Sequence, residues 1–146
     1  MDFVLQVKLA VYRTTARQGG PPEAEALARE LGVPIAKLAE AYADLAKHRL
    51  LVLEGDGLTI RMAPPFSGVP TQHRVRVEGI DYFANCAWDA LAIPAALHRP
   101  GEVHSRCEQS LEPLQLAVGL DGPEPTNWLF HTPVPAARWW QDIVYT

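Results

Sequence analysis

Proline most limits what this chain can fold into, because it is both abundant and unevenly placed. The 146 residues include 13 prolines, and most of them lie after residue 60. Proline has a fixed φ and no backbone N–H, so it interrupts helices and is excluded from the centre of a sheet. We therefore expect the second half of the chain to be rich in loops, with short helices and strands.

The first 48 residues carry apolar side chains at helical spacing. This periodicity predicts a first helix over residues 3–18. A second helix is expected over 22–31, with Gly32 as its C-terminal cap, and a third opens at Pro34 and runs through 46. Only a Gly-Val step separates the second helix from the third, which is the layout of a helix-turn-helix.

After Arg49 the apolar residues form two short runs, 50–53 and 58–62, on either side of Glu54-Gly55-Asp56-Gly57. Two such runs around a Gly/Asp turn predict a β-hairpin. Three helices followed by a hairpin predict a winged helix-turn-helix-like domain over residues 1–63. The Pro- and Gly-containing segment 63–68 predicts a linker between two domains.

Residues 64–146 are expected to form a small mixed α/β core, so that the fold class of the whole chain is α+β. The alternation over 74–77 predicts a half-buried strand, and 82–92 is apolar enough for a buried helix interrupted by Pro94. Further elements are expected at 103–107, 114–120 and 128–131 as short strands and at 136–143 as a last helix. The tryptophans at positions 88, 128, 139 and 140 are expected to lie in the core.

The charge of the chain does not favour nucleic acid or an anionic membrane as a partner. The net charge is −4 and the pI is about 5.7, and affinity for DNA depends chiefly on neutralising phosphates. The residues expected on the exposed face of the third helix include as many acids as lysines: Ala36, Lys37, Glu40, Ala41, Asp44 and Lys47. We therefore expect a winged helix that does not bind DNA, and a winged-helix transcriptional regulator is the alternative.

The two cysteines, Cys86 and Cys107, show no metal-ligand spacing such as Cys-x-x-Cys. We expect both to be reduced thiols in a cytoplasmic protein. The first residues, from Met1 to Val4, do not have the pattern of a signal peptide. No apolar run approaches about 18 residues, so no membrane-spanning segment is expected.

Cys86 and Asp89 are the residues best placed for chemistry. Within a helix they would be one turn apart on the same face. A carboxylate beside a thiol raises the thiol pKa, and it can accept the thiol proton and deliver it elsewhere. A thiolate also prefers soft metals. From spacing alone, the pattern favours a buried cysteine beside a solvated aspartate over a reactive pair.

The surroundings of this pair resemble the catalytic stretch of the alkylmercury lyases, which cleave organomercurials. The resemblance covers residues 82–94, YFANCAWDALAIP, in which an aromatic run leads into Cys-x-x-Asp and ends at a proline. It extends to 103–107, VHSRC, which is similar to the next strand of that family, and to 64–68, PPFSG, which is similar to the entry into its core. The family also has a winged-helix-like N-terminal domain.

The resemblance implies that Cys86 binds mercury and that Asp89 takes up thiol protons and delivers one to the carbon that leaves the metal. The reaction converts R–Hg⁺ and a proton to R–H and Hg²⁺, so Hg(II) is product or bound ligand. No cofactor is required, and free thiols remove the metal. Asn85 stands where better-known members have an aromatic residue.

The resemblance also implies a second mercury-binding cysteine in a later strand, after a stretch comparable to 134–145, and no cysteine follows Cys107 in this sequence. Cleavage would be slow or absent without that thiolate, while capture would persist. Cys107, His104 and His131 are auxiliary ligand candidates. A non-catalytic module that binds or senses mercury or copper is a rival hypothesis, and a missing final strand would leave an edge that favours a homodimer.

Overall fold

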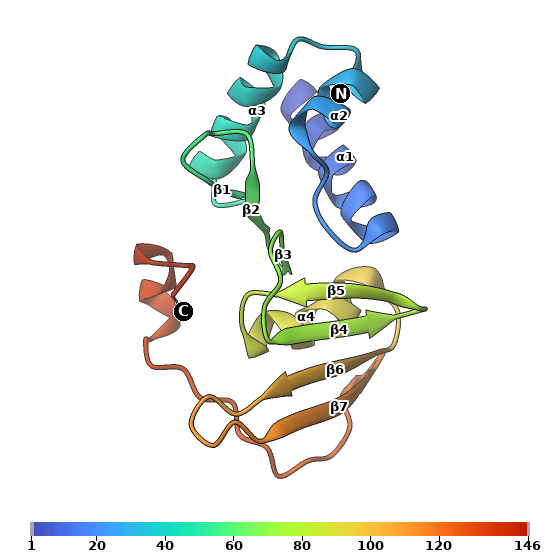
Figure 1. Cartoon of the computed structure of the whole chain (residues 1–146), viewed down its shortest axis with the longest axis vertical. Coiled ribbons are helices and arrows are strands. Elements are labelled where there is room, and N and C mark those ends of the chain that lie inside the picture. Colours follow the sequence, from blue (N-terminus) through green and yellow to red (C-terminus); the bar gives the residue numbers. More distant parts are fainter. Residues whose placement is uncertain (1, 146) are drawn as a thin grey trace.

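The computed structural model describes residues 2–145 and begins with three helices (Figure 1). They are α1 (Phe3–Gln18), α2 (Ala24–Leu31) and α3 (Ile35–Lys47), as the periodicity predicts. Gly32 ends α2 in the left-handed conformation, with φ 66°, which confirms it as the cap. Pro22 and Pro34 lie just before their helices rather than in the first turn. No helix within residues 2–145 is long and apolar enough to cross a membrane.

The predicted hairpin is present as β1 (Val52–Leu53) and β2 (Ile60–Ala63), which pair antiparallel. Its turn is closed by the Asp56 carboxylate. That group accepts hydrogen bonds from the backbone N–H groups of Leu58 at 2.9 Å and Thr59 at 2.8 Å. The Thr59 hydroxyl also donates a hydrogen bond to this carboxylate and has the largest effect on its pKa. Together these bonds stabilise the charged form and lower the Asp56 pKa to about 2.

The expected linker over 63–68 is wrong, because this segment is part of the sheet. Pro64 and Pro65 form a turn, and β3 (Phe66–Ser67) then pairs with β2 on one side and β5 (Ile80–Ala84) on the other. Phe66 is only 3% exposed. The prolines indicate a turn correctly, since a turn does not need their missing N–H groups, but the apolar residue after them continues the ladder.

All strands belong to one antiparallel sheet, in the order β1-β2-β3-β5-β4-β6-β7-β8. Its remaining strands are β4 (His73–Val77), β6 (Gly101–Arg106), β7 (Pro113–Gly119) and β8 (Gly122–Pro123). Helix α4 (Ala87–Leu97) packs against β4, β5, β6 and β7. It covers one face of that part of the sheet, and the opposite face is uncovered (Figure 1).

Three predictions for the second half need correction. Residues 82–84 belong to β5 rather than to a helix, because Tyr82 and Ala84 are buried and Phe83 between them is not, which is the period of a strand. Helix α4 starts at Ala87 and contains Pro94 within it. Residues 128–131 form no strand, and the last helix is a 3₁₀ helix over Ala136–Gln141.

The sheet joins two hydrophobic cores. The first lies between the three helices and the β1–β2 hairpin, and the second lies between α4 and the sheet. Tyr12 packs against both cores, and its hydroxyl donates a hydrogen bond of 2.9 Å to the carbonyl of Pro64. The Tyr82 hydroxyl donates another, of 2.6 Å, to the carbonyl of Ala16 at the end of α1. The three-helix unit is thus fixed to β5, the strand that leads to Cys86.

A substitution at Gly19 can test the contact between the end of α1 and β5. It ends α1 with φ 91°, and a Cβ there would collide with the carbonyl oxygen of Asp81 in β5. Gly32 has a similar φ of 66° and open space around it. We expect Gly32→Ala to lower the free energy of unfolding by about 1–2 kcal/mol, the cost of the left-handed conformation. Gly19→Ala should cost at least about 1 kcal/mol more, measured by urea denaturation, and equal losses would contradict the contact.

Candidate functional site: a thiol and a carboxylate at a helix N-terminus

Cys86 lies where β5 ends and α4 begins. It is the N-cap of α4, with extended φ and ψ of −143° and 175°, and Asp89 is in the first turn. The Cys86 thiol donates a hydrogen bond to Asp89 Oδ2 at 3.5 Å. The Asp89 carboxylate in return accepts a hydrogen bond from the Cys86 backbone N–H. Asp89, three residues after the N-cap, thus accepts from both the thiol and the backbone N–H of Cys86, which is the half of a capping box that the N3 carboxylate supplies.

The prediction that Cys86 and Asp89 lie together is confirmed, although Cys86 caps the helix instead of lying within it. Burial raises the pKa of the Cys86 thiol to about 11, and the Asp89 charge acts in the same direction. The backbone N–H groups of Asp89 and Trp88 act against this rise. Burial also raises the pKa of Asp89. The thiol therefore holds its proton at neutral pH and points it at a carboxylate that can accept it.

Cys86 forms part of the wall of a cavity of about 690 Å³. The cavity lies at the end of the sheet where β5 and β6 finish and β4 and β7 start. Its wall combines polar side chains from these strand ends with apolar and aromatic side chains from the C-terminal segment. The lining includes His73, Asn85, Ser105, Cys107, Leu114, Trp128, Phe130, His131 and Tyr145.

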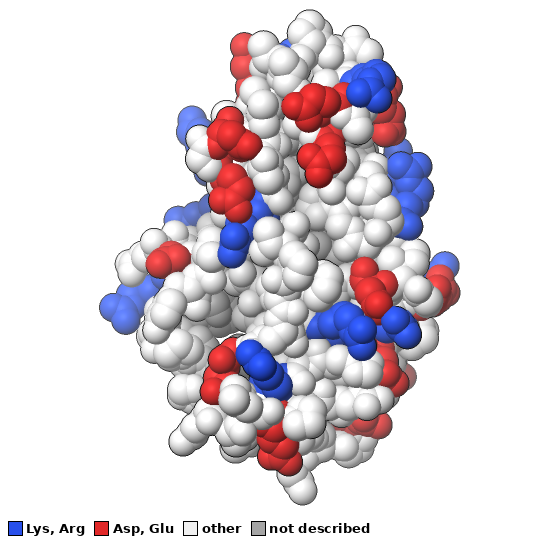
Figure 2. Space-filling model, in the orientation of Figure 1, with Lys and Arg blue, Asp and Glu red and all other residues white. Residues whose placement is uncertain are grey.

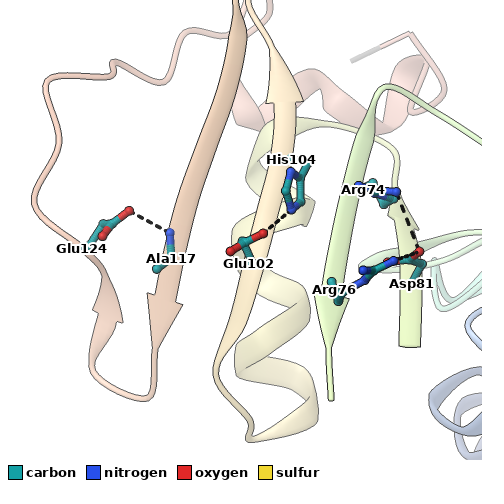
Figure 3. Close-up of polar contacts among 7 residues, drawn as sticks. All are labelled: Arg74, Arg76, Asp81, Glu102, His104, Ala117 and Glu124. Atoms are coloured by element: carbon teal, nitrogen blue, oxygen red, sulfur yellow. Dashed lines mark hydrogen bonds and ion pairs between the residues drawn. The ribbon is translucent and has the colours of Figure 1, made fainter. Parts of the chain in front are cut away.

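Two of the three predicted auxiliary residues reach this cavity. Cys107 and His131 line it. His104 does not, because it alternates with the buried Val103 along β6 and therefore points to the uncovered face. Figure 3 shows His104 there, ion-paired with Glu102 and beside the cluster of Arg74, Arg76 and Asp81. Within residues 2–145, no group of three or more His, Cys, Asp or Glu side chains is arranged to hold a metal ion.

Cys107 differs from Cys86 in its electrostatic surroundings. It is partly exposed and starts the turn that leads into β7, with its N–H bonded to the carbonyl of Glu112 at 2.9 Å. The Ser110 side chain and the backbone N–H groups of Ser110 and Gln109 donate hydrogen bonds to its sulphur and lower the Cys107 pKa. The cavity thus has one thiol that retains its proton and one that loses it more readily.

His73 and Ser105 also line the cavity, and the sequence analysis does not identify them. His73 is 8% exposed, and its Nδ1 lies 2.6 Å from the Ser105 hydroxyl oxygen. Burial lowers the His73 pKa, with Glu108 acting in the opposite direction. The alternation of Val75 and Val77 could have revealed it, since extension by one step places His73 on the same buried face.

The C-terminal segment is held against the cavity by contacts from three elements. The Asn85 side chain donates a hydrogen bond of 3.0 Å to the carbonyl of Ile143. The ring of Phe130 lies 5.7 Å from that of Trp88 on α4. Arg49, after α3, lies over the ring of Trp140 at 5.8 Å. Asn85 therefore helps to position the segment that supplies the aromatic wall.

The expectation that the tryptophans are core residues is wrong. Trp88 and Trp128 are 53% and 43% exposed, and Trp139 and Trp140 are half-buried. They lie on the first turn of α4 and on the C-terminal segment, which lines the cavity instead of filling the core between α4 and the sheet. Aromatic residues with one exposed face are well suited to contact an apolar ligand.

The contrast between the two thiols predicts how they react with iodoacetamide, which alkylates thiolates. At pH 7 we expect Cys107 to be modified first. Cys86 should react slowly, because its thiolate fraction is small and rises about tenfold per pH unit until its pKa of about 11 is approached. Mass spectrometry of the two peptides as a function of pH measures both rates, with unfolded protein as the reference. Equal rates in the folded protein at pH 7 would contradict the description.

Comparison with known proteins finds relatives in one family. The model of the alkylmercury lyase family matches residues 66–146. An alkylmercury lyase of Staphylococcus epidermidis is 31% identical over 107 residues, which are 71% of this chain and 46% of that enzyme. An alkylmercury lyase of Streptomyces lividans is 40% identical over 52 residues, 36% of this chain and 24% of that enzyme.

A crystal structure of the mercury-bound form of MerB2 has a similar fold. The TM-score is 0.61 and the identity 26%, over 82% of this chain and 59% of that one. The chain thus spans about half the length or less of the curated relatives it matches. The family model covers more than half of the chain, and the thiol–carboxylate pair lies inside the matched region. The chain belongs to the alkylmercury lyase family.

Proposed function

We propose that the protein captures organomercurials at Cys86 and cleaves their carbon–mercury bond with a proton from Asp89. The observation that carries this proposal is the hydrogen bond of 3.5 Å from the Cys86 thiol, which lines an open cavity, to the Asp89 carboxylate. The thiol proton passes to Asp89, and the Cys86 thiolate displaces the ligand X of R–Hg–X. Asp89 then returns the proton to the carbon of R–Hg–S, which releases R–H and leaves Hg(II) on the sulphur.

The cavity supports this assignment because it offers an apolar surface next to the reactive sulphur. Trp128, Phe130 and Leu114 line it together with Cys86. An aryl or alkyl group on mercury would pack against these side chains while the metal contacts the sulphur. Asn85 replaces the aromatic residue expected beside the cysteine, and its side chain is already engaged by the carbonyl of Ile143.

The proposed chemistry needs no cofactor, because protons and electron pairs balance between the thiol, the carboxylate and the substrate. Hg(II) is the product and stays on sulphur until other thiols remove it. We propose Cys107 as an auxiliary thiol that accepts the metal, since it lines the same cavity and its pKa is lowered. His131 is a second auxiliary candidate at the cavity, whereas His104 lies on the other face of the sheet.

Incubation with phenylmercury and excess thiol tests the proposal. We expect benzene, detected by gas chromatography, together with mercury that remains protein-bound until thiol is added. Stoichiometric phenylmercury binding without benzene would instead support the rival function, a non-catalytic module that binds or senses a soft metal. If phenylmercury is not bound and no benzene is released, both functions are excluded.

We also propose that residues 1–63 form a winged-helix-like domain that does not bind DNA, and that 64–146 form the lyase core. Support comes from the three helices and the hairpin, and from the mixed charge of the helical unit in Figure 2. Of the residues expected on the exposed face of α3, Ala41 is in fact buried, and Lys37 lies 4.5 Å over the ring of Phe3. Fluorescence anisotropy with duplex DNA at low salt tests this, and tight binding would favour the transcriptional regulator.

A homodimer and a cytoplasmic location are further proposals. Strand β8 pairs with β7 only at Val118 and Gly119. Beyond them, the Glu124 carboxylate accepts a hydrogen bond from the Ala117 N–H (Figure 3), and the Glu124 N–H donates one to the Ala117 carbonyl. Within residues 2–145, no strand pairs with the rest of that edge, which is therefore available to a second copy. Light scattering on a sizing column measures the mass, and a monomer at micromolar concentration would overturn the dimer.

The two free thiols favour a reducing compartment, which cell fractionation tests.

A further inference from the structure

The first residue of β4 places an imidazole at the base of the cavity. His73 is the only histidine among the buried polar residues of the part of the chain described, at 8% exposed. It lines the same cavity as Cys86. Its Nδ1 lies 2.6 Å from the Ser105 hydroxyl oxygen. The contact with Ser105 engages one ring nitrogen, Nδ1, and Nε2 is the nitrogen left to meet a ligand in the cavity.

The register of the sheet places His73 between the last residue of β5, which leads to Cys86, and Ser105 on β6. His73 pairs directly with Ala84 on β5, two residues before Cys86. On its other side, Arg74 pairs with His104 on β6, so that His73 lies opposite Ser105. Cys86 follows the end of β5 as the N-cap of α4, and it lines the same cavity as His73. A ligand that fills this cavity can therefore meet both the Cys86 sulphur and the His73 ring.

The hydrogen bond between His73 Nδ1 and the Ser105 hydroxyl fixes the orientation of the ring. When the Nδ1 proton is donated to the Ser105 hydroxyl, the lone pair of Nε2 is left free to bind a metal. Burial favours the neutral ring, because a charged imidazolium would lose its hydration. Thr71 holds the backbone on either side, since its hydroxyl contacts both His73 and the Ala84 carbonyl.

We propose that His73 Nε2 is a second mercury-binding atom, which acts together with Cys86. This inference rests on the proposed function. Mercury bound to R and to the Cys86 sulphur accepts the Nε2 lone pair in a dative bond, with no change in protons or oxidation state. The added electron density weakens the carbon–mercury bond for protonation by Asp89. After R–H leaves, Hg(II) is held by one sulphur and one nitrogen.

His73 is better placed for this role than the other donors of the cavity. His131 is exposed and lies on a segment without regular secondary structure. Cys107 is partly exposed and lies at the start of a surface turn. A donor that is fixed in a sheet by a hydrogen-bonded neighbour loses little conformational entropy when the ligand binds. Only His73 has this preorganisation together with burial.

Competition for Hg(II) tests the proposal. Cys107→Ser serves as the background, so that the exposed thiol does not bind the metal. Affinity for HgCl₂ is measured against a competing monothiol. In this background we expect His73→Gln to weaken binding by at least about tenfold, and Ser105→Ala by about tenfold through loss of ring orientation. His104→Gln, on the opposite face, is the matched control and should bind as the background does.

NMR of the Cys107→Ser protein gives a measurement in which His73, Ser105 and Cys86 are all unaltered. With ¹⁵N-labelled histidine, one equivalent of HgCl₂ should shift the Nε2 resonance of His73 and leave that of His104 unchanged. An unshifted His73 resonance, or His73→Gln that binds Hg(II) as the background does, would overturn the inference. If Cys86→Ser retains full affinity in the same background, the proposed function itself fails, so the two failures are distinguishable.

Discussion

Cys86→Ser is expected to abolish benzene release from phenylmercury. A serine hydroxyl is a hard oxygen ligand that does not ionise near neutral pH, so it neither displaces the ligand on mercury nor holds the metal. Single-turnover release should fall by at least about a thousandfold, the scale seen when a nucleophile is removed. Gas chromatography of quenched samples measures it.

The matched control for this variant is Cys107→Ser, which removes the other thiol of the cavity. Single-turnover benzene release by this variant should persist, because Cys86 and Asp89 are intact. The loss of Hg(II) from the protein should become slower if Cys107 accepts the metal. Far-UV circular dichroism establishes that both variants are folded. Benzene release by folded Cys86→Ser would remove Cys86 from the mechanism.

Asp89→Asn is expected to separate capture from cleavage. The amide cannot take the thiol proton and return it to carbon, so benzene release should fall by about 10²–10⁴-fold, the usual contribution of a general acid–base. Capture should persist. The Asp89 charge raises the Cys86 pKa, so its removal lowers that pKa and increases the thiolate fraction at neutral pH.

Stopped-flow titration with phenylmercury measures capture by Asp89→Asn, and single-turnover release measures cleavage. Asp121→Asn, which alters an exposed carboxylate in the β7–β8 turn, is the control and should match the parent in both. Normal benzene release by Asp89→Asn would show that another group protonates the carbon. Loss of capture together with loss of helix would instead assign Asp89 a structural role as the partner of the N-cap.

Local patterns were sufficient to predict the first half of the fold. The helix boundaries follow from apolar spacing and from Gly32, and the hairpin follows from two apolar runs around Asp56. The second half was harder, because one largely apolar stretch of sequence, residues 80–97, forms both β5 and α4. Cys86 marks the change from one to the other, and a change of period is hidden when every residue around it is small or apolar.

The site was predicted in part for a similar reason. Cys86 and Asp89 are close in sequence, so their spacing indicated that they lie together. His73 and Ser105 come together only through the pairing of β4 with β6, which is a long-range property that spacing does not contain. His104 was placed wrongly because the face of β6 that meets α4 is set by its neighbours in the sheet.

The position of β3 affects how the whole molecule unfolds. This strand of two residues pairs with β2 of the helical unit and with β5 of the lyase core. Its buried Phe66 contacts Tyr12 and Tyr82 from the two sides. Separation of the two cores would break these pairs and expose three aromatic rings at once. The chain should therefore behave as one cooperative folding unit, in which the stability of the helices is shared with the strand that ends at Cys86.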